Sequence, residues 1–366
     1  KKIWKLSGPM ISFGMIIAWG HYVLGLLLAM FILTPVFGAN PLVASLIEIS
    51  FQGGHGTVAG LATTFEQLGW PEGTDIGYAI ATLSIVVAIV SGIFFINIFH
   101  RKTHTKLHAK IYEKQKEAMI RNGYDLTRLS HKLENNPEKL LIHIGLFGIA
   151  ISLGWFILQS LIFLENLLLV NITALRFFMY LPLFPLAMIG GLLVQLFLKK
   201  MNRQNLVDAK IVHNFSTIAL DFLIASAIAT VSLNVIGDNF MVFLILSVTG
   251  ILWIFSCFFI FAPLIFKKDW FINGITNVGQ AMGVTATGLL LNRLVDPSNR
   301  SKAREIFGYK QLFFEMFMGG GIVTAVSAVM IFQLGSFVAL MISLVAFTFW
   351  LIVGIVISKK NHHHLH

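Results

Sequence analysis

The sequence predicts an all-α polytopic membrane protein, and its composition and apolar runs carry that prediction. Of its 366 residues, 56% are hydrophobic and only 12% are charged, and the mean hydropathy is +0.80. A soluble domain typically carries about 25% charged residues. Several apolar runs exceed the roughly 18 residues that cross a bilayer as a helix. The single cysteine, Cys257, lies within one of these runs, so there is no disulfide framework.

Apolar length and flanking charge predict eight membrane-spanning helices. They lie near residues 10–33, 76–99, 140–164, 172–198, 218–236, 241–266, 312–332 and 336–358. Two further segments, residues 40–70 and 270–296, are less apolar and are interrupted by glycine. Neither segment is typical of a simple span.

The positions of Lys and Arg predict how these segments cross the membrane. The net charge of +10 comes from basic residues between the spans. The positive-inside rule explains them better than a nucleic-acid partner, which we do not expect. Three lysines precede the first span, and the second span ends at the basic loop 100–138. The start of the first span and the end of the second span both lie inside only if segment 40–70 enters and leaves the membrane on the outer side. The basic residues after the later spans require segment 270–296 to enter and leave on the inner side.

This layout predicts two repeats of opposite orientation, residues 1–165 and 166–366, each with a re-entrant helical hairpin. The sequence supports the pairing weakly, since "GTVAGL" (56–61) resembles "GVTATGLL" (283–290). The spans near 172–198 and 218–236 have no counterparts in the first half. We therefore expect two N-terminal helices to be missing from this chain.

The glycine-rich tips of the two hairpins are the predicted binding site. Irregular backbone inside a membrane is tolerated only where it is buried in protein or lines a polar cavity. Where two half-helices meet, free N–H groups favour a carboxylate and free carbonyls favour a hard cation such as Na⁺. Glycine permits a positive φ there and a close approach of the ligand. The candidates in the first hairpin are Glu48, Ser50, Gln52, Gly53, Gly54, His55, Gly56 and Thr57, and those in the second are Asn277, Gly279, Gln280, Gly283, Thr285 and Thr287.

Each of these features also has a plainer interpretation. Small residues let helices pack closely in membranes, and in the second tip this explains the glycines about as well as a ligand does. Two roles are open for Glu48: it faces the path that the cation takes through the protein, or it forms a structural pair with the end of a neighbouring helix. His55 donates to a substrate carboxylate or satisfies a bare carbonyl of the tip. Glu315, near Lys310, sits at a predicted helix start, where the helix dipole accommodates it. The histidines of the basic loop, His100, His104 and His108, are more typical of a solvated helix than of a metal site.

Two stretches carry a resemblance to a known family. "WGHYVLGLLLAMF" followed by "ANPLVASLIEISFQGGHGTVAGLATTFEQLG" resembles the sodium:glutamate symporter family, and "MGVTATG" (282–288) is similar to that family's second re-entrant tip. The resemblance implies Na⁺-coupled uptake of glutamate, an elevator-like movement, homodimers, and a place among the lipids of a bacterial inner membrane. The 2-hydroxycarboxylate transporters are a distant relative. Met282 and Ala286 depart from the family pattern, which bears on the substrate more than on the fold.

Three other functions compete with this one. The same architecture would serve a symporter of a di- or hydroxycarboxylate. An intramembrane hydrolase could use His55, but the sequence holds no Gly-x-Ser-Gly or Gly-x-Gly-Asp pattern to supply its nucleophile or acid. A channel would not need opposed hairpins with ligand-binding tips. We therefore expect a transporter and not an enzyme.

Overall fold

The computed structural model describes residues 2–102, 137–168 and 176–362. Within these ranges the regular secondary structure is helical, without a strand. In the described part of the chain, eight helical segments are long and apolar enough to cross a membrane. The predicted class, an all-α polytopic membrane protein, is confirmed. The basic loop lies almost wholly outside the described residues, and with it His104 and His108.

The spans follow the predicted order. The first runs through α1 (Lys2–Leu28), a π-helical turn (Ala29–Leu33) and α2 (Thr34–Phe37). The others are α5 (Glu72–Lys102), α8 (Pro137–Leu168), α9 (Leu183–Lys200), α10 (Ala209–Thr230), α12 (Phe240–Ser256) with a π-helical turn (Cys257–Phe261) and α13 (Ala262–Ile265), α16 (Ala303–Phe317) with α17 (Ile322–Leu334), and α18 (Ser336–His362). The remaining elements are η2 (Pro41–Ser45), α3 (Leu46–Phe51), α4 (Gly54–Gln67), η3 (Phe178–Tyr180), η4 (Gln204–Leu206), α11 (Leu233–Asp238), α14 (Trp270–Met282) and α15 (Thr285–Val295).

Three predicted spans need correction. The fourth begins at Leu183 and not near residue 172, because the extended Pro182 precedes its first turn. The fifth is shifted toward the N-terminus, since Asp208 caps α10 by accepting from the Lys210 N–H at 2.8 Å and the helix ends at Thr230. The seventh is not one helix but two, α16 and α17, separated by residues 318–321.

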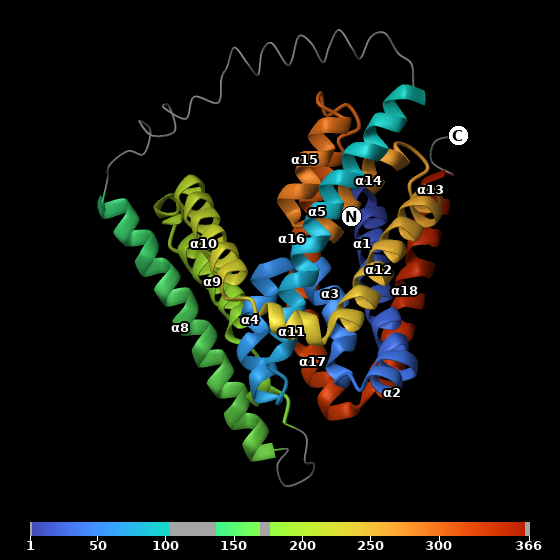
Figure 1. Cartoon of the computed structure of the whole chain (residues 1–366). Coiled ribbons are helices and arrows are strands. Elements are labelled where there is room, and N and C mark those ends of the chain that lie inside the picture. The colour runs from blue at the N-terminus through green and yellow to red at the C-terminus, as the bar shows by residue number, and fades with distance from the viewer. Residues whose placement is uncertain (1, 103–136, 169–175, 363–366) are drawn as a thin grey trace.

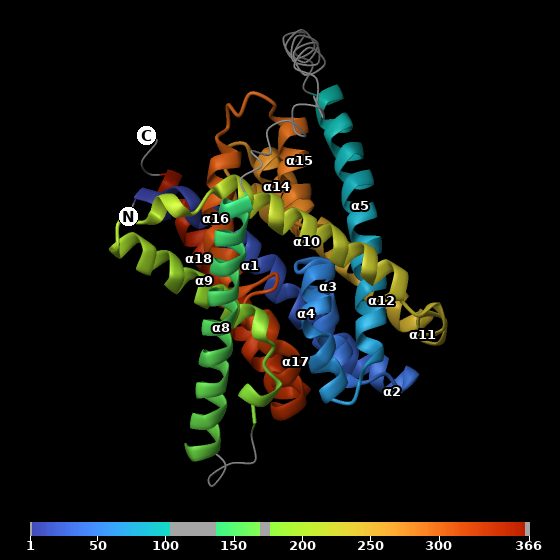
Figure 2. The same cartoon turned by 90° about the vertical axis from the view of Figure 1, so that its left-hand side faces the viewer.

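Two pairs of short helices lie between the spans. The first pair is α3, entered through η2, with α4, and the second pair is α14 with α15. Figures 1 and 2 show the second pair above the first, with their turns directed toward each other near the middle of the molecule. In Figure 1 the α3–α4 pair opens toward the lower end and the α14–α15 pair opens toward the upper end.

The helices fall into two groups. Helices α8, α9 and α10 lie on the left of Figure 1, with α8 packed along α9 and α10 also in contact with α4, and the other spans form the main body with both short pairs. The largest apolar core is in the main body, where α1 is deeply buried. Its Gly20 lies against the indole of Trp253, whose Nε1 donates to the Ile17 carbonyl at 3.0 Å. A smaller cluster of Leu181, Leu186 and Ala325 joins α9 to α17.

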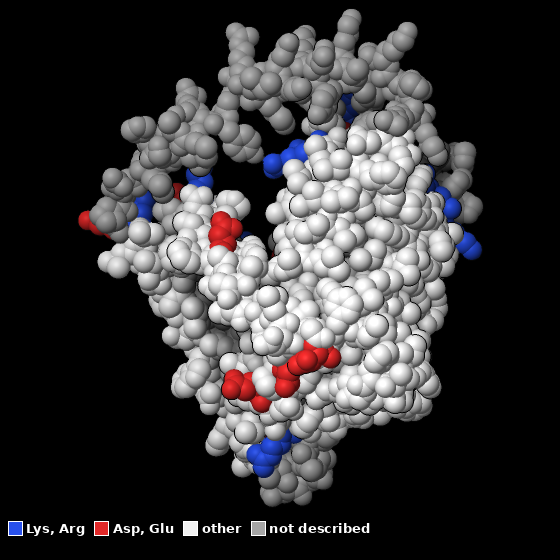
Figure 3. Space-filling view, viewed as in Figure 1, with Lys and Arg blue, Asp and Glu red and all other residues white. Residues whose placement is uncertain are grey.

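Charged side chains leave most of the visible surface free. Figure 3 shows a broad central band almost without Lys, Arg, Asp or Glu, as a lipid-facing surface requires. Acidic side chains lie near the lower end, where one basic group also lies, and on the upper left, whereas most visible Lys and Arg side chains lie toward the upper end. This asymmetry agrees with the side that the positive-inside rule assigns to the cytoplasm.

Candidate functional site

The turns of the two short helix pairs touch. The side-chain amide of Gln280, on α14, donates to the amide oxygen of Gln52 at 3.0 Å. An added Cβ on Gly54 would lie 3.4 Å from Val284 Cγ1 and 3.7 Å from the Gly283 carbonyl oxygen. The two tips that the sequence places far apart in the chain therefore form one contact.

The first tip turns at a glycine with a positive φ. Helix α3 ends at Phe51, and α4 begins at Gly54, whose φ is +64°. Residues with a Cβ adopt this left-handed backbone region only at an energetic cost, so the turn favours glycine at this position. Gly53 itself is right-handed, and its carbonyl accepts from the Thr57 hydroxyl at 3.0 Å.

The second tip is an extended break between tightly packed helices. Gly283 and Val284 leave the helical region, with φ of −133° and −143°. An added Cβ on Gly279 would lie 3.0 Å from the Gly288 Cα, so this glycine lets α14 and α15 approach closely. Thr287, in the first turn of α15, is also buried. Close packing thus accounts for Gly279, as the plainer interpretation proposed.

A third glycine-rich break completes the site, within a stretch that the sequence predicts to be one continuous span. Residues 318–321 separate α16 from α17, and Gly319 and Gly320 have φ of +65° and +107°. An added Cβ on Gly320 would lie 2.7 Å from the Thr57 hydroxyl oxygen of the first tip. The three successive glycines in "MGGG" (318–321) are the signal in the sequence that indicates this break inside the predicted span 312–332.

Glu48 holds this break against the first pair. Its carboxylate is fully buried, and Oε1 accepts from the Gly319 N–H and the Thr324 hydroxyl, each at 3.0 Å. Oε2 accepts from the Tyr22 hydroxyl of α1 at 2.7 Å. No basic side chain is among these partners. Of the two roles predicted for Glu48, the structural link to a neighbouring helix end is the one seen.

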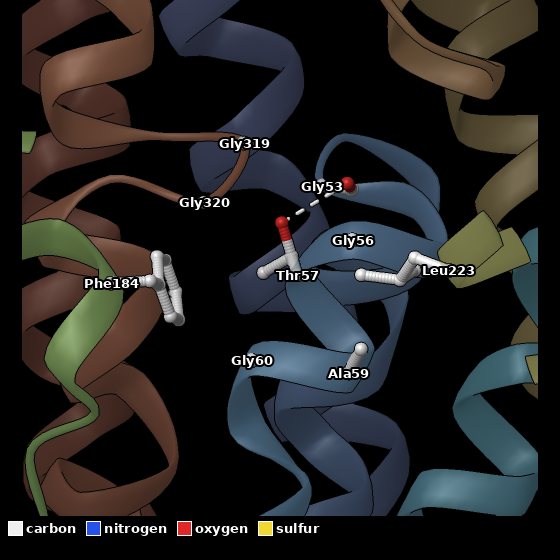
Figure 4. A pocket seen from close by; sticks show the side chains of 9 residues that line it. All are labelled: Gly53, Gly56, Thr57, Ala59, Gly60, Phe184, Leu223, Gly319 and Gly320. Atoms are coloured by element: carbon white, nitrogen blue, oxygen red, sulfur yellow. Dashed lines mark hydrogen bonds between the residues drawn. The ribbon is translucent and has the colours of Figure 1, made fainter. Parts of the chain in front are cut away.

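A cavity of about 480 Å³ lies where these parts meet the α8–α10 group. Figure 4 shows Phe184 of α9 pointing toward α4, with the Gly319–Gly320 turn above it and Leu223 of α10 on the other side. The lining residues are Gly53, Gly56, Thr57, Ala59, Gly60, Phe184, Leu223, Gly319 and Gly320. The cavity is therefore shared by the first tip, the broken span and the separate helix group.

His55 faces α5 and not the cavity. Its Nε2 lies 2.9 Å from the Thr82 hydroxyl oxygen, and its ring stacks on Tyr78. The Thr82 hydroxyl donates its only proton to the Tyr78 carbonyl, so it must accept from His55 Nε2–H. In the neutral ring Nδ1 is then an acceptor, and this atom is buried without a partner among the described residues.

A polar network surrounds the second tip on its other side. The Thr285 hydroxyl donates to Glu315 at 2.7 Å, and the Gln311 amide donates to both of them. Lys310 in turn donates to Gln311 and Gln280. The position predicted for Glu315 was wrong, because α16 begins at Ala303 and Glu315 lies near its end. This carboxylate is held by hydrogen bonds and not by a helix start.

The oxygens at the tips suit a hard cation. Among the described residues no group of three or more His, Cys, Asp or Glu side chains could hold a metal ion. However, Ser50 Oγ and Asn277 Oδ1 are buried oxygens without a hydrogen-bond partner in the part of the chain that the structure describes. Hydroxyl and carbonyl oxygens are ligands that hard cations prefer, so each of these two atoms has the chemistry of a Na⁺ ligand.

Comparison with known proteins points to one family. Residues 7–294 match the family model described as sodium/glutamate symporter. This match covers both short helix pairs and most of the spans. No curated protein and no solved structure gives a significant match.

Proposed function

Because the chain belongs to the sodium/glutamate symporter family, we propose that it is a secondary transporter that uses Na⁺ entry to drive glutamate uptake. The observation that carries this proposal is the family match over residues 7–294, which includes both glycine tips. The buried polar groups around the tips support it, because they offer both donors and oxygen ligands. A multi-pass place in a bacterial inner membrane belongs to the same proposal.

The two short helix pairs act as re-entrant hairpins from opposite faces. Helix α4 has 14 residues and α14 has 13, so each rises about 20 Å, less than the roughly 30 Å of a bilayer core. Neither helix can cross alone. Their opposite opening directions (Figure 1) and the charge asymmetry favour the inverted repeats 1–165 and 166–366.

Substrate and Na⁺ bind around the touching tips. A carboxylate suits the donors at the start of α4 and α15, and Na⁺ suits the oxygens of Ser50 and Asn277. Gly53, Gly56 and Thr57 present the first tip to the cavity, where a small amino acid can approach the backbone. Na⁺ supplies the driving force and charge compensation when it is bound.

The transport movement carries the main body past helices α8–α10. The cavity supports this division, because Phe184 and Leu223 close it from the separate group while all its other lining residues belong to the main body. An elevator-like displacement of the tips against α9 and α10 would open the cavity to the other face. The homodimer that the family resemblance implies is part of this proposal.

The energetics favour at least two Na⁺ per substrate. Moving a glutamate monoanion inward against 100 mV costs about 2.3 kcal/mol, and one Na⁺ only cancels that term. A tenfold sodium gradient adds about 1.4 kcal/mol per ion. Two ions therefore supply on the order of 5 kcal/mol in total, since the second also moves with the potential.

The experiment that tests this function is uptake of labelled glutamate into proteoliposomes under an inward Na⁺ gradient. We expect saturable accumulation with Na⁺ and none when choline replaces it. Clamping the membrane potential gives the stoichiometry, because one-to-one coupling moves no net charge and two ions move one positive charge. Sodium-independent or unsaturable flux would indicate a channel. Accumulation of succinate or citrate in preference to glutamate would assign the symporter to a di- or hydroxycarboxylate.

A further inference from the structure

Lys310 places a buried amine behind the two tips. Its side chain is fully buried in α16, beside Gly14 of α1, where an added Cβ would lie 2.6 Å from the lysine Cε. Its Nζ lies 3.7 Å from the centre of the Phe314 ring. A buried cation is costly unless its donors are used. Lys310 uses two of them on neutral oxygens, at 2.8 Å to Gln280 Oε1 and 2.6 Å to Gln311 Oε1.

This arrangement fixes the direction of a chain of amides. The lysine ammonium can only donate, so Gln280 must turn its oxygen toward Lys310. The nitrogen of Gln280 then points toward the first tip and donates to Gln52 Oε1 at 3.0 Å. Gln52 therefore has its own nitrogen left over. That nitrogen is buried and has no acceptor among the described residues.

The other arm from Lys310 ends differently. Gln311 also turns its oxygen to the lysine, and its nitrogen donates to Thr285 and to Glu315 at 2.9 Å. A carboxylate thus already terminates this arm. Of the two arms, only the one through Gln280 ends on a donor without a partner among the described residues, and Gln52 directly precedes Gly53, which lines the cavity.

We propose that Lys310 is a positioning residue for substrate, which orients Gln280 and Gln52 so that the free Gln52 amide N–H receives a substrate carboxylate. Hydrogen bonds in series polarise one another, so the positive charge strengthens the last donor without touching the ligand. A carboxylate completes the chain through a charge-assisted bond, whereas a neutral amide does so less well. The inference rests on the proposed function and gives it a basis for preferring anionic substrates.

Gln52→Glu tests the end of the chain with little change of shape. The new carboxylate still accepts from Gln280, but it offers no donor and repels an anion. We expect the KM for glutamate to rise about 10- to 100-fold, as for the loss of a hydrogen bond to a charged group, with a smaller change in kcat. Glutamine lacks the side-chain carboxylate of glutamate, and isoglutamine lacks the α-carboxylate. The variant should lose the preference for glutamate over the one of these two compounds that lacks the carboxylate bound by Gln52.

Lys310→Met tests the origin of the chain, because methionine fills the space beside Gly14 and Phe314 without a charge. It should raise the KM and lower the same selectivity, and in a Gln52→Glu background it should have little further effect. Ser343→Ala on α18, which removes a buried hydrogen bond to the Ala339 carbonyl on a helix that contributes no residue to the tips, is the control and should keep the selectivity of the wild type. Additive effects of Lys310→Met and Gln52→Glu, or an unchanged selectivity in the Gln52→Glu variant, would overturn the proposal.

A binding measurement separates this inference from the proposed function. Glutamate, succinate and glutamine are each added to the full chain in detergent with Na⁺, and the shift in unfolding temperature is recorded. Suppose that wild type fails to transport glutamate, that succinate stabilises it, and that both Gln52→Glu and Lys310→Met reduce this stabilisation. The substrate assignment then fails, while the inference about Lys310 and Gln52 stands. If wild type transports glutamate and both variants still bind it equally well, only the inference about Lys310 and Gln52 fails.

Discussion

Gly54→Ala is the substitution that most sharply tests the role of the first tip. Gly54 has a φ of +64°, and an added Cβ would lie 3.4 Å from Val284 Cγ1, an ordinary van der Waals distance. Alanine therefore fits the space between the tips. What it does not fit is the backbone conformation, because a left-handed residue with a Cβ costs about 1–2 kcal/mol.

Gly38→Ala is the matched control for this strain. Gly38 has a φ of +65°, and nothing lies within 4 Å of an added Cβ. Both variants should therefore lose about 1–2 kcal/mol of stability by the same mechanism. If the tip conformation belongs only to the state that binds substrate, the same energy in Gly54→Ala shifts that equilibrium by about 5- to 30-fold. Gly38→Ala should leave transport unchanged.

The assay compares glutamate uptake and thermal unfolding for the wild type and both variants. We expect similar unfolding temperatures for the two variants, and a 5- to 30-fold loss of apparent affinity or rate for Gly54→Ala alone, which follows from the energy above. Equal transport by the two variants would refute the reasoning, because it would mean that the conformation of Gly54 matters for folding only.

The remaining predictions concern the glycine break, its anchor and an extramembrane loop. Gly320→Ala should abolish most uptake while the protein still folds, because its φ of +107° disfavours other residues and the added Cβ would lie 2.7 Å from the Thr57 hydroxyl oxygen. The check is to measure uptake with variant protein that elutes in size-exclusion chromatography at the same volume as the wild type. Glu48→Gln should lower the free energy of unfolding by about 1–3 kcal/mol, because three buried donors lose a charged acceptor; an unchanged melting curve would contradict it. Burial alone raises the pKa of Asp296, but hydrogen bonds from Ser301 and Arg300 outweigh it and hold the pKa below its usual range. Its stabilisation is therefore complete above the unfolded value of about 3.9 and is lost as the pH falls through the folded pKa, so Asp296→Asn should flatten the pH dependence of unfolding below about pH 4.

Most of the fold could be predicted because the bilayer imposes long apolar helices. The errors arose where polar and apolar residues share one helix. Helix α16 carries Arg304 and Glu305 on one side and buries Phe307 and Phe314 on another, so its first turns did not resemble a span. Similarly, the start of α10 is polar, and only the cap at Asp208 marks where the helix begins.

The candidate site was only partly predictable. The glycines of the first tip could be recognised because they cluster around His55 inside an apolar chain. The positive φ of Gly54 is the physical reason that glycine is needed there. The contact between Gln52 and Gln280 could not, because it joins residues 228 positions apart and depends on how both pairs pack. Lys310 was overlooked for a related reason, since its burial follows from the position of Gly14 on another helix. His55, the most conspicuous residue of the motif, faces α5 instead.

Sided labelling of single cysteines tests most directly whether the two short helix pairs open on opposite faces of the membrane. Replacing Cys257 by serine removes the only native cysteine, and single cysteines then flank each pair at Val36, Glu72, Lys268 and Ser298. An impermeant maleimide should label Val36→Cys and Glu72→Cys from the outside only, and Lys268→Cys and Ser298→Cys from the inside only. If the two positions flanking either pair react from opposite sides, that pair is an ordinary crossing and the two tips cannot form a shared site.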